Sequence, residues 1–200
     1  GVGSPEGWLC ARMMLAALCL TASRMTSRGC TGQEIATTAN HVNHANHSDT
    51  AAAKQQVDTK LKVVFDTYFL LKDALVKTDG KAAVTVAKDV LTALNAVKME
   101  ELAMDVHVVW MKEMNGLMAG AKNISETQDI KRQREIFIPL SKSMYELIKV
   151  AKYETPVYLQ FCPMANDGKG ANWLSKENAV KNPYYGSQMM TCGKTVETIQ

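Results

Sequence analysis

The sequence lacks several features that define common classes of protein. Its net charge is only +3, with 23 basic and 20 acidic residues spread along the chain. That charge is too small and too dispersed to predict a nucleic-acid-binding surface. There is no Gly-x-Ser-x-Gly motif to anchor a serine hydrolase triad. The Gly168-x-Gly170 pair is too short for a phosphate-binding loop. We therefore predict that the protein is not an enzyme.

Long apolar runs are also missing, and the most apolar stretch lies near the start of the chain. Met13–Ala22 follows Arg12 and has the length of a signal-peptide core, too short to span a bilayer. The following Gly29-Cys30 pair is typical of a lipoprotein cleavage site, although Ser27-Arg28 replaces the usual small apolar residues. We expect residues 1–32 to be a leader, and the protein to be periplasmic or a membrane-anchored, extracytoplasmic lipoprotein. The alternative is upstream sequence with no role in the mature protein.

Histidine is scarce, and three of the four histidines lie close together. Residues 33–52 are polar and show no apolar periodicity, which predicts a flexible tether. Within it, His41, His44 and His47 could chelate zinc or copper(II) without a fold. The alternative is a neutral polar linker.

Four segments after residue 50 carry apolar side chains at three- and four-residue steps, the pattern of amphipathic helices. We expect helices over residues 51–78, 81–97, 99–124 and 129–152. Asp79 can cap the second helix. Ser125 and Gln128 have the spacing of a capping box, and Pro139 should kink the last helix. The short connections favour an antiparallel four-helix bundle, an all-α fold.

The character of the chain changes at Thr155-Pro156. Residues 157–161 and 194–199 are β-prone, and the stretches 166–170 and 182–186 are typical of turns. We expect an irregular C-terminal cap with short β segments on the helical bundle. Residues 53–200 would then form one domain, made of the bundle and a metal-binding cap.

Two short sulfur clusters lie in this cap. One is Cys162-Pro163-Met164 and the other is Met189-Met190-Thr191-Cys192. Thiolate and thioether are the ligands that copper(I) prefers. If the intervening loop folds back, Cys162, Met164, Met189 or Met190, and Cys192 could bind one copper(I) or silver(I) ion.

Other interpretations of these residues stay open. Two cysteines in an oxidising compartment could instead form a disulfide, and the methionines could be packing residues. His107, on the third predicted helix, could supply a nitrogen ligand or simply belong to the core. Nearby aromatic residues would shield an ion from water: Tyr158, Phe161, Trp173, Tyr184 and Tyr185.

The runs IKRQREIFIPLSKSMYELI, YLQFCPMANDGKGANWLS and NPYYGSQMMTCG together resemble a bacterial extracytoplasmic family, domain of unknown function 3347. The resemblance covers about residues 57–199. It implies a helical domain outside the cytoplasm, associated with copper and silver efflux adaptor proteins. The expected function is therefore to buffer copper(I) or silver(I) or to transfer it to an efflux partner. The alternative is a disulfide-stabilised helical interaction module with no metal role.

Overall fold

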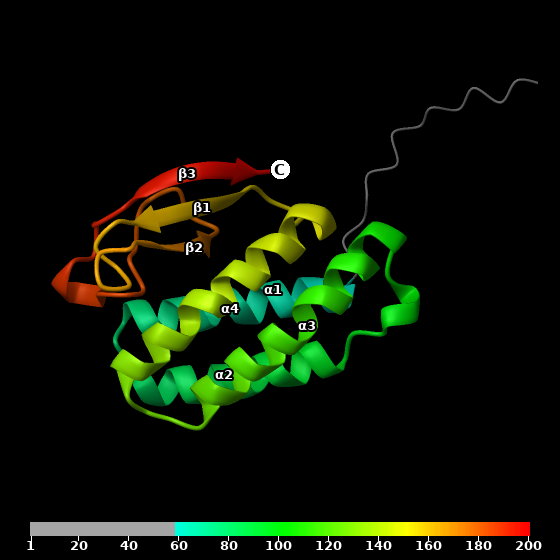
Figure 1. The fold of residues 1–200 in the computed structure, drawn as a ribbon, viewed down its shortest axis with the longest axis horizontal. Coiled ribbons are helices and arrows are strands. Elements are labelled where there is room, and N and C mark those ends of the chain that lie inside the picture. The colour runs from blue at the N-terminus through cyan, green and yellow to red at the C-terminus, as the bar shows by residue number, and fades with distance from the viewer. Residues whose placement is uncertain (1–58) are drawn as a thin grey trace, which may run out of the picture. The chain divides into compact units, whose positions relative to one another are not determined.

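The computed structural model describes residues 59–200. The described part of the chain begins with four helices: α1 (Thr59–Val76), α2 (Gly80–Asn95), α3 (Met104–Ser125) and α4 (Ile130–Ala151) (Figure 1). A short 3-10 turn, η1 (Met99–Glu101), lies between α2 and α3. The prediction of four helices in contact is confirmed, since consecutive helices pack together and α1 also contacts α4. Within residues 59–200, no helix is long and apolar enough to cross a membrane.

Aspartates begin two of these helices. The side chain of Asp79 accepts a hydrogen bond from the backbone N–H of Ala82, as predicted. Asp129 caps α4 by accepting from the N–H of Lys131. The predicted capping box at Ser125 is wrong, because Ser125 is the last residue of α3 and donates to the carbonyl of Lys122.

A small sheet follows the helices. Three strands pair antiparallel in the order β2-β1-β3: β1 (Val157–Cys162), β2 (Ala171–Ser175) and β3 (Lys194–Ile199). A 3-10 turn, η2 (Gly186–Gln188), lies between β2 and β3. The all-α assignment is therefore wrong, and the fold is mostly helical but α+β overall. The short β-prone segments pair with one another, which satisfies backbone groups that an irregular cap would leave unpaired.

The sheet packs on the helices through a shared core. β2 contacts α4 and α1, and Figure 1 shows the sheet lying along one side of α4. At this contact the buried hydroxyl of Tyr68, on α1, lies 2.9 Å from that of Ser141, on α4. The same hydroxyl accepts the backbone N–H of Leu174 at 3.0 Å. One tyrosine therefore fixes β2 against two helices.

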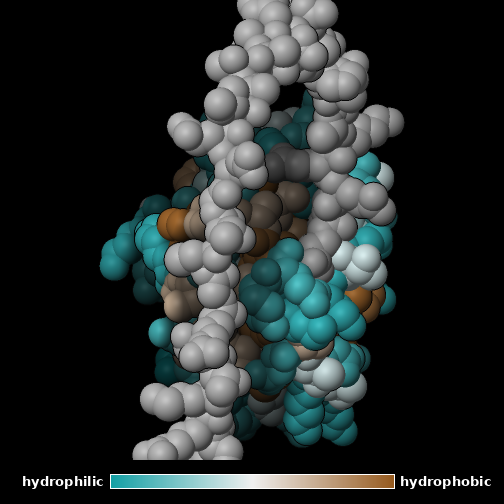
Figure 2. Space-filling view, turned by 90° about the vertical axis from the view of Figure 1, so that its right-hand side faces the viewer, coloured by the Kyte–Doolittle hydropathy of each residue, from teal (hydrophilic) through white to brown (hydrophobic). Residues whose placement is uncertain are grey.

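Figure 2 views the domain from the end at which η1 and the start of α3 lie. Hydrophobic side chains are mixed with hydrophilic ones on this face. Four large hydrophobic residues of this region are exposed: Met99, Met104, Val108 and Met111.

Candidate functional site

The fold brings the two predicted cysteine ligands together. Cys162 is the last residue of β1, and Cys192 lies two residues before β3. Their Sγ atoms are 3.4 Å apart, and both are free cysteines. A disulfide is about 2.05 Å long, so these are separate thiols in contact. Cys162 is buried and Cys192 is partly exposed, so one side of the pair is open to solvent.

Strand pairing explains this proximity. β1 and β3 pair antiparallel up to the partners Phe161 and Lys194, which draws the residues just before β3 alongside the end of β1. Gly193 completes the approach with a φ of 141°. A Cβ at this position would lie 2.8 Å from the carbonyl oxygen of Phe161 and 3.0 Å from the Trp173 ring. Only glycine allows the chain carrying Cys192 to come this close.

A buried asparagine holds the Cys192 segment from the other side. Asn182 donates its side-chain amide to the carbonyl of Cys192 at 2.8 Å. Its backbone N–H donates to the carbonyl of Met190 at 2.9 Å, and its side-chain oxygen accepts the N–H of Tyr184. Sequence reasoning treated Asn182-Pro183 only as a turn. The Asn-Pro pair is a turn signal, but its role in placing Cys192 emerges only from the three-dimensional contacts.

The three predicted methionine ligands lie on the loops that carry the cysteines. Met189 accepts the backbone N–H of Cys192 at 3.1 Å, and both Met189 and Met190 are partly exposed. Met164 follows Cys162, and its side chain is 52% exposed. The hydroxyl of Tyr185 donates to the Met164 carbonyl at 2.6 Å, which ties this loop to the turn before η2. The thioethers of Met164, Met189 and Met190 therefore lie within three residues of a cysteine in the sequence, and all three residues are at least partly exposed.

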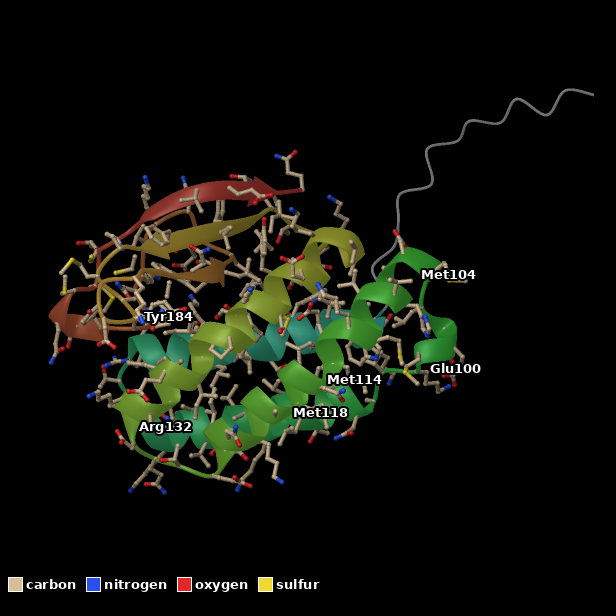
Figure 3. The ribbon with its side chains drawn as sticks, in the orientation of Figure 1. Glu100, Met104, Met114, Met118, Arg132 and Tyr184 are labelled. Atoms are coloured by element: carbon tan, nitrogen blue, oxygen red, sulfur yellow. The ribbon has the colours of Figure 1, made fainter. Side chains whose placement is uncertain are left out.

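Two buried aromatic residues lie close to the chain around the thiol pair: Trp173 near Gly193 and Tyr184 near Cys162. Trp173 and Tyr184 are buried, and their rings meet edge to face with centroids 5.8 Å apart. Tyr184 lies between the sheet and the helices (Figure 3) and donates its hydroxyl to the carbonyl of Asn172. Burial raises the pKa of Tyr184, and the nearby Cys162 adds to this shift. Two of the five predicted shielding aromatics are therefore buried, while Tyr158, Phe161 and Tyr185 are partly exposed.

Cys192 holds its proton more strongly than a free thiol does. Contact with Cys162 raises the pKa of the Cys192 thiol, and burial adds to the effect. A soft cation must therefore displace at least one thiol proton when it binds, because the metal ligand is the thiolate.

His107, the predicted nitrogen ligand within residues 59–200, does not lie at this cysteine pair. His107 lies near the start of α3, which packs on α2 and α4, and Figure 1 shows this end of α3 far from the end of β1. His41, His44 and His47 lie outside the described residues, as do the predicted leader and tether. Within residues 59–200, no three His, Cys, Asp or Glu side chains gather in a geometry that could hold a metal ion. The remaining predicted donors in the described part of the chain are the thioethers of Met164, Met189 and Met190, on the loops that carry the cysteines.

Comparison with models of protein families gives a match. The model of a family described as "Protein of unknown function (DUF3347)" matches residues 64–155. This span includes most of α1 and all of α2, α3 and α4, and it ends before β1. The paired cysteines therefore lie beyond the matched residues. Comparisons with curated proteins and with solved structures gave no match.

Proposed function

Residues 64–155 are a DUF3347 family domain, and from this membership and the paired thiols we propose that the protein binds copper(I) or silver(I) outside the cytoplasm. Its role would be to buffer the ion or transfer it to a metal efflux or adaptor protein. No reaction is catalysed in this proposal.

One observation carries the proposal: two free thiols in contact, Cys162 and Cys192, at 3.4 Å. Soft thiolate and thioether ligands select copper(I) over hard cations. Cys162 and Cys192 supply the thiolates, and a methionine of the adjoining loops supplies a thioether. The candidates are Met164, Met189 and Met190.

Partial exposure of Cys192 suits transfer to a partner. An incoming ligand can reach the ion from the solvent side and replace one protein ligand at a time. His41, His44 and His47 precede the domain and would capture ions before they reach the thiols. Attachment to a membrane would occur only through a lipid on the leader.

Metal titration tests the proposal in the full chain. The five cysteines are first reduced to two by replacing Cys10, Cys19 and Cys30 with serine. The protein is purified anaerobically, its thiols are counted, and copper(I) is added against a competing chelator. We expect one tightly bound ion. Cys162→Ser should weaken copper(I) binding by about a hundredfold. Loss of a group that only hydrogen-bonds to a metal ligand typically costs about 10- to 100-fold in affinity, and loss of a ligand itself costs at least as much.

Thr191→Ser is the matched control, because it changes a neighbouring side chain without removing a sulfur. No tight binding by the fully reduced protein would disprove the proposal. Binding that survives loss of both cysteines, but not of the three histidines, would place the site in the segment before residue 52.

The same geometry favours a second candidate function, a disulfide-stabilised interaction module. Thiols in contact can be oxidised to a disulfide with little backbone movement, and such a bond typically stabilises a fold by about 2–4 kcal/mol. Thiol counting separates the two proposals. A protein isolated with Cys162 and Cys192 bonded, and indifferent to copper(I) after reduction, would support the module.

A further inference from the structure

A stripe of four methionines and one histidine runs along α3, away from the cysteine pair. Its members follow one another at alternating three- and four-residue steps: Met104, His107, Met111, Met114 and Met118. At 3.6 residues per turn, side chains at such steps share one face of a helix. Figure 3 shows Met104, Met114 and Met118 spread along α3. The stripe contains four of the 12 methionines of the chain.

The stripe divides into a packed half and an open half. Met114 and Met118 are partly buried and pack against the hydrophobic core. Met104 is 78% exposed, the highest value among the large hydrophobic side chains of the described region, and Met111 is 49% exposed. His107 lies between these two and is partly exposed. Met114 and Met118 stabilise the fold by packing against the core. Met104 and Met111 bury little apolar area, so they contribute little to stability.

Helix geometry places the imidazole between the two exposed thioethers. Met104 precedes His107 by three residues and Met111 follows it by four, so each has its Cβ about 5–6 Å from that of His107. Helical side chains lean toward the N-terminus. The His107 ring therefore leans over the turn of Met104, and Met111 leans back toward His107. Methionine has three flexible bonds, which lets both sulfurs reach an ion held by the ring.

The surroundings suit a monovalent cation. Asp105 lies in the same turn, but its carboxylate accepts the backbone N–H of Val106 and it is not one of the ligands. Imidazole and thioether together are ligands of copper(I), whereas hard cations prefer oxygen.

We propose that Met104, His107 and Met111 form a second binding site for a soft monovalent cation, copper(I) or silver(I), separate from the cysteine pair. The site is open, uses only neutral ligands and holds its ion more weakly than the thiols do. Such a site loads and releases its ion readily.

Silver(I) titration of the full chain tests this site directly. All five cysteines are replaced by serine, so the outcome is independent of the function proposed for the thiols. Methionine methyl groups and histidine rings are labelled for NMR. We expect the signals of Met104, Met111 and His107 to shift together and to saturate with one ion. Met104→Leu with Met111→Leu should weaken binding at His107 by about tenfold or more, because two ligands are lost.

Met114→Leu with Met118→Leu is the matched control and should leave the His107 response within about twofold, since leucine conserves the packed volume. Three results would overturn the proposal. The first is an absence of shifts at the two exposed methionines in a folded protein. The second is a His107 response unaffected by Met104→Leu with Met111→Leu. The third is methyl shifts that follow protein concentration instead of silver, which would identify the stripe as a self-association surface.

Discussion

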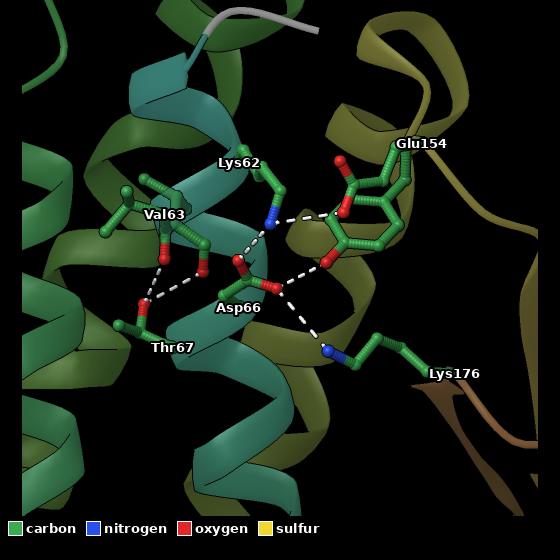
Figure 4. Close-up of polar contacts among 8 residues, drawn as sticks. Lys62, Val63, Asp66, Thr67, Glu154 and Lys176 are labelled. Carbon is green, nitrogen blue, oxygen red and sulfur yellow. Dashed lines mark hydrogen bonds and ion pairs between the residues drawn. The ribbon is translucent and has the colours of Figure 1, made fainter.

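At the scale of single residues, Asp66 is the centre of a polar cluster between α1 and the segments around it (Figure 4). Its carboxylate pairs with Lys62 at 2.7 Å and Lys176 at 3.5 Å, and accepts the hydroxyl of Tyr153. Lys62 also pairs with Glu154. Burial alone would raise the pKa of Asp66, but the bonds from Lys62 and Tyr153 outweigh it and lower that pKa. Burial and the bond to Asp66 raise the pKa of Tyr153 to about 12.

We predict that Asp66→Asn lowers the free energy of unfolding at pH 7 by about 1–2 kcal/mol, a typical loss for charged hydrogen bonds at a partly exposed site. A lowered folded-state pKa stabilises the fold above the unfolded value of about 3.9. That stabilisation disappears as the pH falls through the folded value. The gap between variant and wild type should therefore shrink below about pH 4. Urea unfolding at a series of pH values measures this difference in the free energy of unfolding. Asp89→Asn, at an exposed position, is the control. A gap that does not change with pH would contradict the prediction.

At the scale of secondary-structure elements, Arg134 on α4 joins three segments. Its guanidinium donates to the carbonyl of Leu75 at the end of α1, to the hydroxyl of Thr78 in the turn after α1, and to the carbonyl of Pro183. Burial lowers the pKa of Arg134. Gly186 lies against the same group with a φ of 57°, where a Cβ would come within 2.8 Å of the guanidinium. The helices and the segment before η2 are thus assembled around one planar cation.

We predict that Arg134→Lys destabilises the protein by about 1–3 kcal/mol. A lysine ammonium lacks the planar fork and cannot reach all three acceptors at once. Arg132→Lys is the matched control, because Arg132 is on the surface of the same helix and its ion pair is with the exposed Glu135. Urea unfolding compares the two variants. Equal stability of Arg134→Lys and Arg132→Lys would show that Arg134 does not join the elements.

The helices were predictable at this scale because their signals are local. Apolar spacing located all four, whereas the caps were harder: both Ser125 and Asp129 suit a cap, and only contacts reveal that Asp129 is used. The sheet depends on distant partners such as Leu159 and Glu197, with an irregularity after Leu159. No local pattern encodes that pairing.

The candidate site was predictable in its chemistry but not in its assembly. Residue type alone identified Cys162 and Cys192 as possible partners, and strand pairing brings them together. His107 gave no local sign of lying at the other end of the helical layer. The spacing of Met104, His107 and Met111 can be read from the sequence. Only the structure shows that both methionines are exposed and so do not serve as core residues.

At the scale of the whole domain, residues 59–200 share a hydrophobic core that extends from the helices into the sheet. Trp110 on α3 and Trp173 on β2 both belong to it and are fully buried. A continuous core predicts that both layers unfold together. Neither indole N–H has a hydrogen-bond partner within the described residues, so replacing either ring with phenylalanine removes an unpaired donor.

We therefore predict coincident unfolding of the two layers. In a Trp8→Phe background, Trp110→Phe leaves Trp173 to report on the sheet, and Trp173→Phe leaves Trp110 to report on the helices. In each variant, the fluorescence and far-UV circular dichroism midpoints in urea should agree within error. A Trp173 transition at lower urea than the helical signal would show that the sheet unfolds separately.

The pairing of β1 with β3 has a consequence for how binding energy would be used. In a zinc finger, metal affinity is consumed in folding the chain. Here the strands, Gly193 and Asn182 already hold the two thiols in place. Bringing Cys162 and Cys192 together costs conformational entropy, because the segment between them forms a closed loop. Pairing of the strands offsets that cost when the domain folds, before any ion binds. The domain would therefore be folded before any ion binds, and a bound ion would add to its stability by mass action instead of creating the fold.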